Sequence, residues 1–513
     1  MNEDIYEELE KQEQVIDKFN TDLPRVVVGF QEAAVKYSFY NEIPATVSFY
    51  TLLGSIVKDH VIIPDGFNKL DTRLHFLWIQ TSGTGKSTLW NFLKPVTKKV
   101  YNRINKKGSH PTFVNPNYDE TRAGEEFYND ANPAYLDRVY DIFGITDYTD
   151  AALIGNLKIQ EEIVIDEENN SRERVQVMKR VKGSLEGDGL AHWDEFEYSG
   201  IFKNSKHNEK SIVYLNTMMN TIHGESYIIT KALDAYDELE HSCFGQRSVL
   251  AMTYPPNNLS KVMVSTGVIP RFLVYVWDVP EHIQNEIRLT KIRNTGKVMN
   301  AEQPVDRFAD ALFKIYELVE ARYKEVGGNP IETIRFSEEY NDVLELEYRR
   351  LMQYIDGTRK EVRKHVGTFL NRMNDHLIKM AVLSCIASAP NITDPSKRFI
   401  VTGKNVLQAS KIIRQTYSSL VDWVELHTKR QKQENLAAKS LKINFLSGFK
   451  ELKESSDDGL VNKRELFKVV AEKVKKSEVQ ISRDYVKLEI NELFVESRDG
   501  KKKFVELKEG VEE

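Results

Sequence analysis

The sequence predicts an α/β protein whose core contains a parallel β-sheet, followed by a helical region and a small C-terminal unit. Three observations support this prediction. A short apolar strand at 77–80 precedes a glycine-rich loop and a helix, apolar side chains recur at helical spacing through 301–433, and residues 434–513 read as three helices and a β-hairpin. We therefore expect an N-terminal helical collar over 1–60, the α/β core over 61–300, a helical lid over 301–433 and the C-terminal unit over 434–513.

Composition and charge place the chain among ordinary water-soluble proteins. It has 513 residues, of which 41% are hydrophobic and 29% are charged, and its formal net charge is −6. Such a charge is not that of a strongly basic nucleic-acid-binding protein, but it leaves room for local basic surfaces. Cys243 and Cys385 are the only cysteines, which excludes a disulfide framework or a cysteine-rich zinc site.

No stretch suggests a leader or a membrane segment. Residues 1–22 are acidic and helix-forming without an apolar segment, and the sequence has no run of about 18 apolar residues. We expect a soluble protein of the cytoplasm, with no membrane partner.

The glycine-rich loop is the strongest single motif in the chain. Residues 81–88 read T-S-G-T-G-K-S-T between an apolar strand and a helix, which is the arrangement of a P-loop, where backbone N–H groups bind nucleotide phosphates at a helix N-terminus. Lys86 is expected to reach the β- and γ-phosphates, and the Ser87 hydroxyl to ligate Mg²⁺. The strict pattern has glycine at position 80, where this chain has Gln80. The sequence therefore predicts a site for ATP and Mg²⁺ formed by Ser82, Gly83, Thr84, Gly85, Lys86, Ser87 and Thr88.

Hydrolysis at such a site requires carboxylates at the end of another strand. Asp194 and Glu195 follow a mostly apolar approach at 190–193. Asp194 is expected to hold Mg²⁺, directly or through water, and Glu195 to orient and polarise the attacking water. The competing interpretation is the acidic run at 166–168, whose approach is more apolar but which continues like a turn.

Polar side chains at later strand ends are further candidates. Residues 226–233 and 247–253 are strand-like around a loop that includes Asp237, and Thr253 or Asn257 lies where a sensor of the γ-phosphate is expected.

One arginine precedes another very apolar strand. Arg271 stands before 272–277, and we interpret it either as a structural cap over the strand end or as an arginine finger. Such a finger stabilises charge on the transferred phosphate, often from a neighbouring subunit. Arg372 is a weaker candidate for a phosphate contact, because a single helix arginine is more simply explained as solvated or salt-bridged.

Residues 158–182 predict a β-hairpin inserted into the core, with a turn at 167–171. Its basic side chains are either a solvated surface or a surface that neutralises the phosphates of a polyanion. These side chains are Arg172, Arg174, Lys179, Arg180 and Lys182.

Helices account for most of the collar and the lid. Two are expected in the collar, at 27–40 and 45–59, and the lid is expected to contain helices at 304–326, 337–355, 362–389 and 404–433.

The C-terminal unit has the element order of a winged-helix domain. Helices are expected at 436–453, 462–474 and 482–493, with Asn462 and Ser482 as N-caps.

A β-hairpin with an Asp-Gly turn follows these helices at 494–505. The third helix would present Arg483 and Lys487 to DNA, and a protein-contact role for the unit is an equal alternative because its basic and acidic residues nearly balance.

Taken in order, the motifs resemble those of the helicase half of phage and plasmid primase–helicases. The matching segments are 81–88, a helix start at 149–153, 192–196 and 267–272. The Arg-Phe step at 271–272 is also similar to the arginine-finger segment of minichromosome-maintenance helicases, which carry a C-terminal winged helix. The resemblance implies a P-loop NTPase core of the RecA or AAA+ type and a homo-oligomeric ring, commonly a hexamer, with ATP sites between subunits and single-stranded DNA in the pore.

The function expected from this resemblance is that of an ATP-dependent replicative DNA helicase or translocase of a virus, plasmid or other mobile element. Its partners would be forked duplex DNA and a separate primase or polymerase, because the primase half is absent. The alternatives are an ATP-switched DNA-binding replication initiator and a nucleic-acid remodelling ATPase that does not unwind processively.

Overall fold

The computed structural model describes most of the chain, with gaps. The described residues are 22–38, 40–66, 68–108, 113–114, 120–122, 124, 135–136, 139–145, 155–166, 171–183, 187–196, 211–220, 227–233, 236–243, 246–254, 268–296, 301–358, 360–456, 460–487, 490–499 and 502–508. The chain divides into two compact units, Met1–Trp423 and Val424–Glu513, and each is treated separately below.

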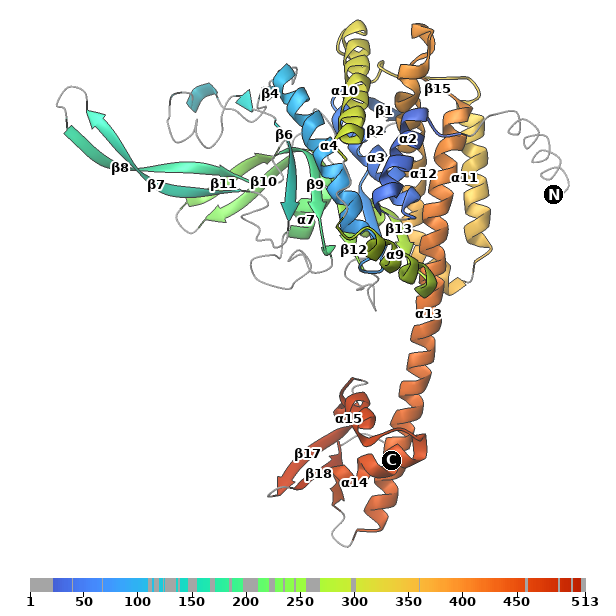
Figure 1. Ribbon diagram of the computed structural model, residues 1–513. Helices are drawn as coiled ribbons and strands as arrows, with labels where there is room; N and C mark the ends of the chain where they lie inside the picture. The colour runs from blue at the N-terminus through green and yellow to red at the C-terminus, as the bar shows by residue number, and fades with distance from the viewer. Residues whose placement is uncertain are drawn as a thin grey trace, which may run out of the picture. The chain divides into compact units, whose positions relative to one another are not determined.

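A five-stranded, all-parallel β-sheet forms the centre of the first unit (Figure 1). The predicted α/β class with a parallel sheet is therefore confirmed. Strands β3, β9 and β12 are buried along their whole length, as strands covered on both faces must be. In spatial order the strands are β13 (Leu273–Trp277), β3 (Phe76–Gln80), β12 (Arg247–Thr253), β9 (Asp188–Trp193) and β6 (Tyr140–Ile145).

The helices nearest the sheet include one that has no exposed face. Helix α3 (Glu42–Val57) contacts β3, β9 and β12, and every residue from Pro44 to Val57 is buried. It approaches the chain before β3 so closely that a Cβ on Gly54 would lie 2.2 Å from the Thr72 carbonyl oxygen. It packs against α2 (Arg25–Ser38) and α4 (Lys86–Lys107), and the first unit also contains α7 (Ser211–Asn220) and α9 (Glu281–Arg293).

The helical region after the core has the expected helices. Helix α10 (Glu302–Glu325) packs along α4, where charged side chains of the two helices pair, for example Lys107 with Glu320. The others are α11 (Tyr340–Asp356), α12 (Lys360–Ser388) and α13 (Gly403–Glu454). The predicted break between helices at 404–433 and 436–453 was wrong. Both belong to α13, because no glycine or proline interrupts residues 404–447.

Among the described residues, two hairpins form separate two-stranded sheets. The predicted hairpin is present as β7 (Gly155–Asp166) and β8 (Ser171–Lys182). A second, formed by β10 (Tyr227–Leu233) and β11 (Tyr236–Cys243), corrects the expected loop around Asp237, which lies in β11. The error arose because two connecting residues suffice for a hairpin. The expected helix start at 149–153 lies outside the described residues.

Short strands and turns complete the first unit. Strands β1 (Ile62–Asp65) and β2 (Asn68–Asp71), β4 (Phe113–Val114) and β5 (Tyr135–Leu136), and β14 (Arg335–Phe336) and β15 (Ile400–Val401) form pairs, and the 3-10 turn η5 (Ile269–Arg271) precedes β13. Among the described residues, no helix combines the length and the apolar character that crossing a membrane requires.

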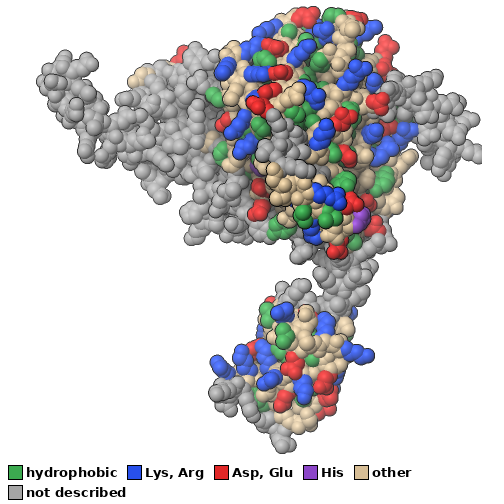
Figure 2. Space-filling view, viewed as in Figure 1, with side chains coloured by type: hydrophobic (Ala, Val, Ile, Leu, Met, Phe, Trp, Pro, Cys, Tyr) green, Lys and Arg blue, Asp and Glu red, His purple; other side chains and the backbone are tan. Residues whose placement is uncertain are grey.

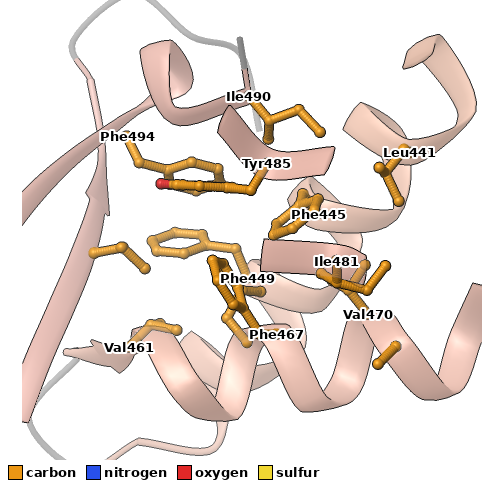
Figure 3. Close-up of a cluster of buried hydrophobic side chains, with 13 residues drawn as sticks. Leu441, Phe445, Phe449, Val461, Phe467, Val470, Ile481, Tyr485, Ile490 and Phe494 are labelled. Atoms are coloured by element: carbon orange, nitrogen blue, oxygen red, sulfur yellow. The ribbon is translucent and has the colours of Figure 1, made fainter. Parts of the chain in front are cut away.

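The second unit has a small aromatic core. Figure 3 shows Phe445, Phe449, Phe467, Tyr485 and Phe494 directed toward one another, from helices and from one strand of the unit's sheet. Besides the end of α13, the unit comprises β16 (Val461–Asn462), α14 (Lys463–Val474), α15 (Glu478–Lys487), the turn η8 (Ile490–Leu493), β17 (Phe494–Asp499) and β18 (Lys502–Leu507), with strand order β16-β18-β17.

One of the two predicted N-caps in this unit is confirmed. The Asn462 side chain accepts a hydrogen bond from Arg464 N at 2.9 Å at the start of α14. Ser482 is not a cap, because the third helix already begins at Glu478. There the Ser477 hydroxyl accepts from Gln480 N (3.3 Å), so the cap is the serine five residues earlier.

Candidate nucleotide site

The glycine-rich loop lies between the end of β3 and the start of α4. Gly83 and Gly85 have φ angles of +77° and +106°, a backbone region that other residues enter only with strain. A loop at the C-terminal edge of a parallel sheet is where ligands of such sheets commonly bind.

A pocket of about 170 Å³ opens beside this loop. It brings together most of the expected loop residues and the acidic pair 194–195, which is distant in sequence. It is lined by Ser82, Gly83, Gly85, Lys86, Ser87, Thr88, Asp194, Glu195, Thr253, Tyr254 and Lys291. Thr84, a loop residue also expected to bind nucleotide, is buried and is not part of the lining.

The Lys86 ammonium is held by the loop itself. Its Nζ donates to the carbonyl oxygens of Gln80 and Thr81, the latter at 3.3 Å. Burial lowers the pKa of Lys86 to about 8, and the carboxylates of Asp194 and Glu195 oppose that shift. The pocket therefore pairs a desolvated cation with two carboxylates.

The acidic pair follows β9 directly. Both side chains are exposed, and Glu195 has φ +54°, which places a non-glycine residue in the left-handed region. The competing run begins at Asp166, the last residue of β7, which pairs with β8 and does not belong to the five-stranded sheet. The structure thus brings Asp194 and Glu195 to the loop, whereas Asp166 ends a strand outside the five-stranded sheet.

Thr253 ends β12, the strand between β3 and β9. Its hydroxyl oxygen is buried and has no hydrogen-bond partner in the part of the chain that the structure describes. A buried hydroxyl without a partner is costly, and this one belongs to a residue that lines the pocket. Asn257, the alternative sensor, lies outside the described residues.

Two contacts to the loop were missed by sequence reasoning. Gln80 is completely buried, and its side-chain amide binds Thr84 within the loop. Lys291, on α9, donates to the Gly83 carbonyl oxygen at 2.6 Å. Pro280 followed by Glu281 is a sequence signal for a helix start at α9, but nothing in the sequence indicates where Lys291 points.

Arg271 lies away from this pocket. It precedes β13, and the end of β13 at Trp277, not its start, is paired with Gln80. Its Nε donates to Asn220 Oδ1 (2.9 Å), and burial together with the nearby Arg372 lowers its pKa. Arg372 in turn pairs with Asp375 at 3.0 Å.

The residues expected to bind DNA belong to β8 and to α15 of the second unit. Arg172, Arg174, Lys179, Arg180 and Lys182 lie along β8, and their side chains are outside the described set. Arg483 is exposed on α15, whereas Lys487 is the last residue of that helix and its side chain is not described. On the face shown in Figure 2, acidic and basic side chains of the described residues are interspersed rather than gathered by sign.

The described residues contain no group of three or more His, Cys, Asp or Glu side chains that could hold a metal ion on its own. A Mg²⁺ ion at Ser87 and Asp194 would depend on phosphate and water oxygens for its remaining ligands, which is usual for this ion. No protein-family model and no curated protein matches this sequence.

Proposed function

We propose that this chain is a P-loop ATPase that couples the hydrolysis of ATP to movement along DNA. One observation carries the ATPase part of the proposal. The glycine-rich loop, Lys86, the acidic pair 194–195 and Thr253 all belong to one pocket at the C-terminal edge of a parallel sheet, and the buried Thr253 hydroxyl has no hydrogen-bond partner among the described residues.

Each residue then has a role that follows from its position. Backbone N–H groups of the loop and the Lys86 ammonium bind the phosphates, and the Thr253 hydroxyl gains its missing partner from the terminal phosphate or the attacking water. Ser87 and Asp194 would hold Mg²⁺, which neutralises phosphate charge when bound. Glu195 accepts a hydrogen bond from the attacking water and polarises it.

Replacing the proposed base tests the assignment. Glu195→Gln keeps the size of the side chain but cannot take a proton, so we expect hydrolysis to fall by about 10²-fold or more while ATP affinity stays within about twofold. Steady-state phosphate release and equilibrium binding of MgATP measure the two effects.

The competing acidic run supplies the matched control. Asp166→Asn removes a carboxylate that lies outside the five-stranded sheet, so hydrolysis should remain at the wild-type rate. The reverse result, with Asp166→Asn inactive and Glu195→Gln active, would show that the wrong pair has been chosen.

The ring is proposed on the position of Arg271. The five residues of β13 span roughly 16 Å, so an arginine before β13 is far from its own loop at the other edge of the sheet. It would complete the site of a neighbouring subunit, which fits a homo-oligomeric, hexameric ring with ATP sites between subunits.

For the C-terminal unit we propose a winged-helix domain, on the order of its helices and its hairpin, with α15 as the helix that meets DNA. The helicase proposal predicts ATP-dependent separation of a forked duplex and ring assembly, read by strand displacement and native mass measurement. An ATP-switched initiator would instead bind duplex DNA without separating it, and Arg483→Ala would abolish that binding.

A further inference from the structure

Gln80 is the feature of the phosphate loop that the usual motif does not explain. Its side chain is 0% exposed, and each end of its amide has a partner. Gln80 Oε1 accepts from Trp78 Nε1 at 2.6 Å. Gln80 Nε2 donates to Asn41 Oδ1 at 2.9 Å and to Thr84 Oγ1 at 2.8 Å. A buried amide with these partners is held in one orientation.

These contacts hold one peptide unit of the loop. The Thr84 carbonyl oxygen accepts from Asn41 Nδ2 (3.1 Å) and from Gln80 Nε2 (3.3 Å), and the Thr84 hydroxyl donates to Thr81 O (2.6 Å). A trans peptide is planar, so its C=O and N–H groups point in opposite directions. Holding the Thr84 oxygen therefore turns the Gly85 N–H away from Asn41 and Gln80, and Gly85 lines the pocket whereas those two residues do not.

The anchor belongs to a closely packed part of the fold. Asn41 is buried and directly precedes α3, whose residues are buried from Pro44 to Val57. The loop is thus tied to a packed helix outside its own strand–loop–helix segment. Side chains held by such a support keep a binding geometry without help from the ligand.

We propose that Gln80 and Asn41 are positioning residues that hold the phosphate loop in its binding conformation before the nucleotide arrives. This inference rests on the proposed function of the pocket. At position 80, where the strict motif has a glycine, the hydrogen-bonded side chain of Gln80 forms a scaffold for the loop together with Asn41. Because the scaffold removes part of the cost of ordering the loop, it acts on nucleotide affinity and not on the hydrolytic step.

Two substitutions at position 80 test this in the full-length protein. Gln80→Met keeps an unbranched side chain of similar length without the amide, and Gln80→Gly restores the strict P-loop pattern. We expect the Kd for MgADP to rise about 3- to 10-fold in Gln80→Met, the loss expected for one or two hydrogen bonds. Gln80→Gly should also bind more weakly than the wild type, although its loop matches the common pattern better.

Steady-state kinetics separate positioning from a merely structural role. In both variants KM for ATP should rise while kcat at saturating ATP stays within about twofold, because the occupied loop is ordered by its ligand. Gln246→Met is the matched control, since it removes the amide of another buried glutamine, directly before β12 at the opposite edge of the sheet. Its affinity for MgADP should equal that of the wild type.

A double variant tests whether the two residues act on the same carbonyl group. Asn41→Ala should weaken MgADP binding like Gln80→Met, and the combined variant should bind only slightly more weakly than the weaker single variant. If the increase in Kd of the double variant equals the product of the two single increases, the two residues act independently and the shared role is overturned.

The measurements distinguish failure of the proposed function from failure of the positioning role. If the wild type does not bind MgADP, the proposed function itself is wrong. If the wild type binds but both Gln80 variants bind equally well, or lose kcat with unchanged KM, only the positioning role is overturned.

Discussion

At the scale of single residues, three residues that line the pocket are in energetically unfavourable states. Lys86 is desolvated, Glu195 has a left-handed backbone and Thr253 keeps a buried hydroxyl without a partner among the described residues. Each of these features costs stability, and their coincidence in one place is more typical of a functional site than of a structural one. Burial, backbone angles and missing hydrogen-bond partners are properties of the folded structure, so the sequence alone does not show them.

The lowered pKa of Lys86 predicts a pH dependence of nucleotide binding. Below a pH of about 8 the ammonium of the empty site is charged, and above that value it loses its proton. Bound phosphates favour the charged form, so binding takes up a proton at high pH and affinity falls by up to about tenfold per pH unit. Titrations with MgADP between pH 7 and pH 9.5 measure this. An affinity that stays constant over the whole range would contradict the assignment of Lys86.

At the scale of elements, α3 supports both the sheet and the phosphate loop. It contacts three strands of the sheet, and Asn41, just before its first turn, binds the loop. The sequence predicts this helix but not its place, because a helix without an exposed polar face has no periodicity that indicates which side is covered. At Gly54 this helix lies directly against the chain before β3, and the Thr72 hydroxyl donates to the Gly54 carbonyl oxygen at 2.9 Å.

Gly54→Ala tests this close packing. Alanine favours a helix by about 1 kcal/mol, but its Cβ would lie 2.2 Å from a backbone oxygen that cannot rotate away, and overpacking of this kind costs about 1–3 kcal/mol. We expect a lower free energy of unfolding in urea. Gly29→Ala on α2 is the control, because its Cβ would meet only side-chain atoms, at 3.8 Å or more, and it should be neutral or stabilising. Equal effects of the two substitutions would argue against the steric explanation.

At the scale of the whole molecule, the sheet separates the two halves of the proposed catalytic machinery. The loop lies where β3 ends, whereas Arg271 lies before β13 begins, and the two strands are parallel neighbours. Under the ring proposal, an arginine finger at this position would serve only a neighbouring subunit, so activity would require a head-to-tail contact between copies.

Mixing two inactive variants tests this arrangement. Arg271→Ala should lower hydrolysis on the order of 10³-fold, and Glu195→Gln should be similarly impaired. In rings assembled from equal amounts of both, about a quarter of the head-to-tail contacts join an intact Glu195 to an intact Arg271. Phosphate release by the mixture should recover to about that fraction of the wild-type rate. A mixture as inactive as its components would overturn the ring proposal, as would a fully active Arg271→Ala.

The sequence by itself determined the parts that depend on neighbouring residues. The phosphate loop, the buried strands, most helices, the Asn462 cap and the hairpin at 158–182 are encoded in short stretches whose backbone preferences and apolar spacing are local. The missed strand β11, the uninterrupted α13 and the early start of α15 are local errors in placing boundaries.

Only the tertiary structure decided which distant residues meet. The order of the five strands brings Asp194, Glu195 and Thr253 to the loop, and it leaves Asp166 outside the sheet and Arg271 at the opposite edge. The packing of α3 places Asn41 against the Gln80 side chain, and the position of α9 places Lys291 against the Gly83 carbonyl group of the loop. The physical reason is that strand order and helix packing follow from the burial of apolar surface across the whole chain, which no short stretch of sequence encodes.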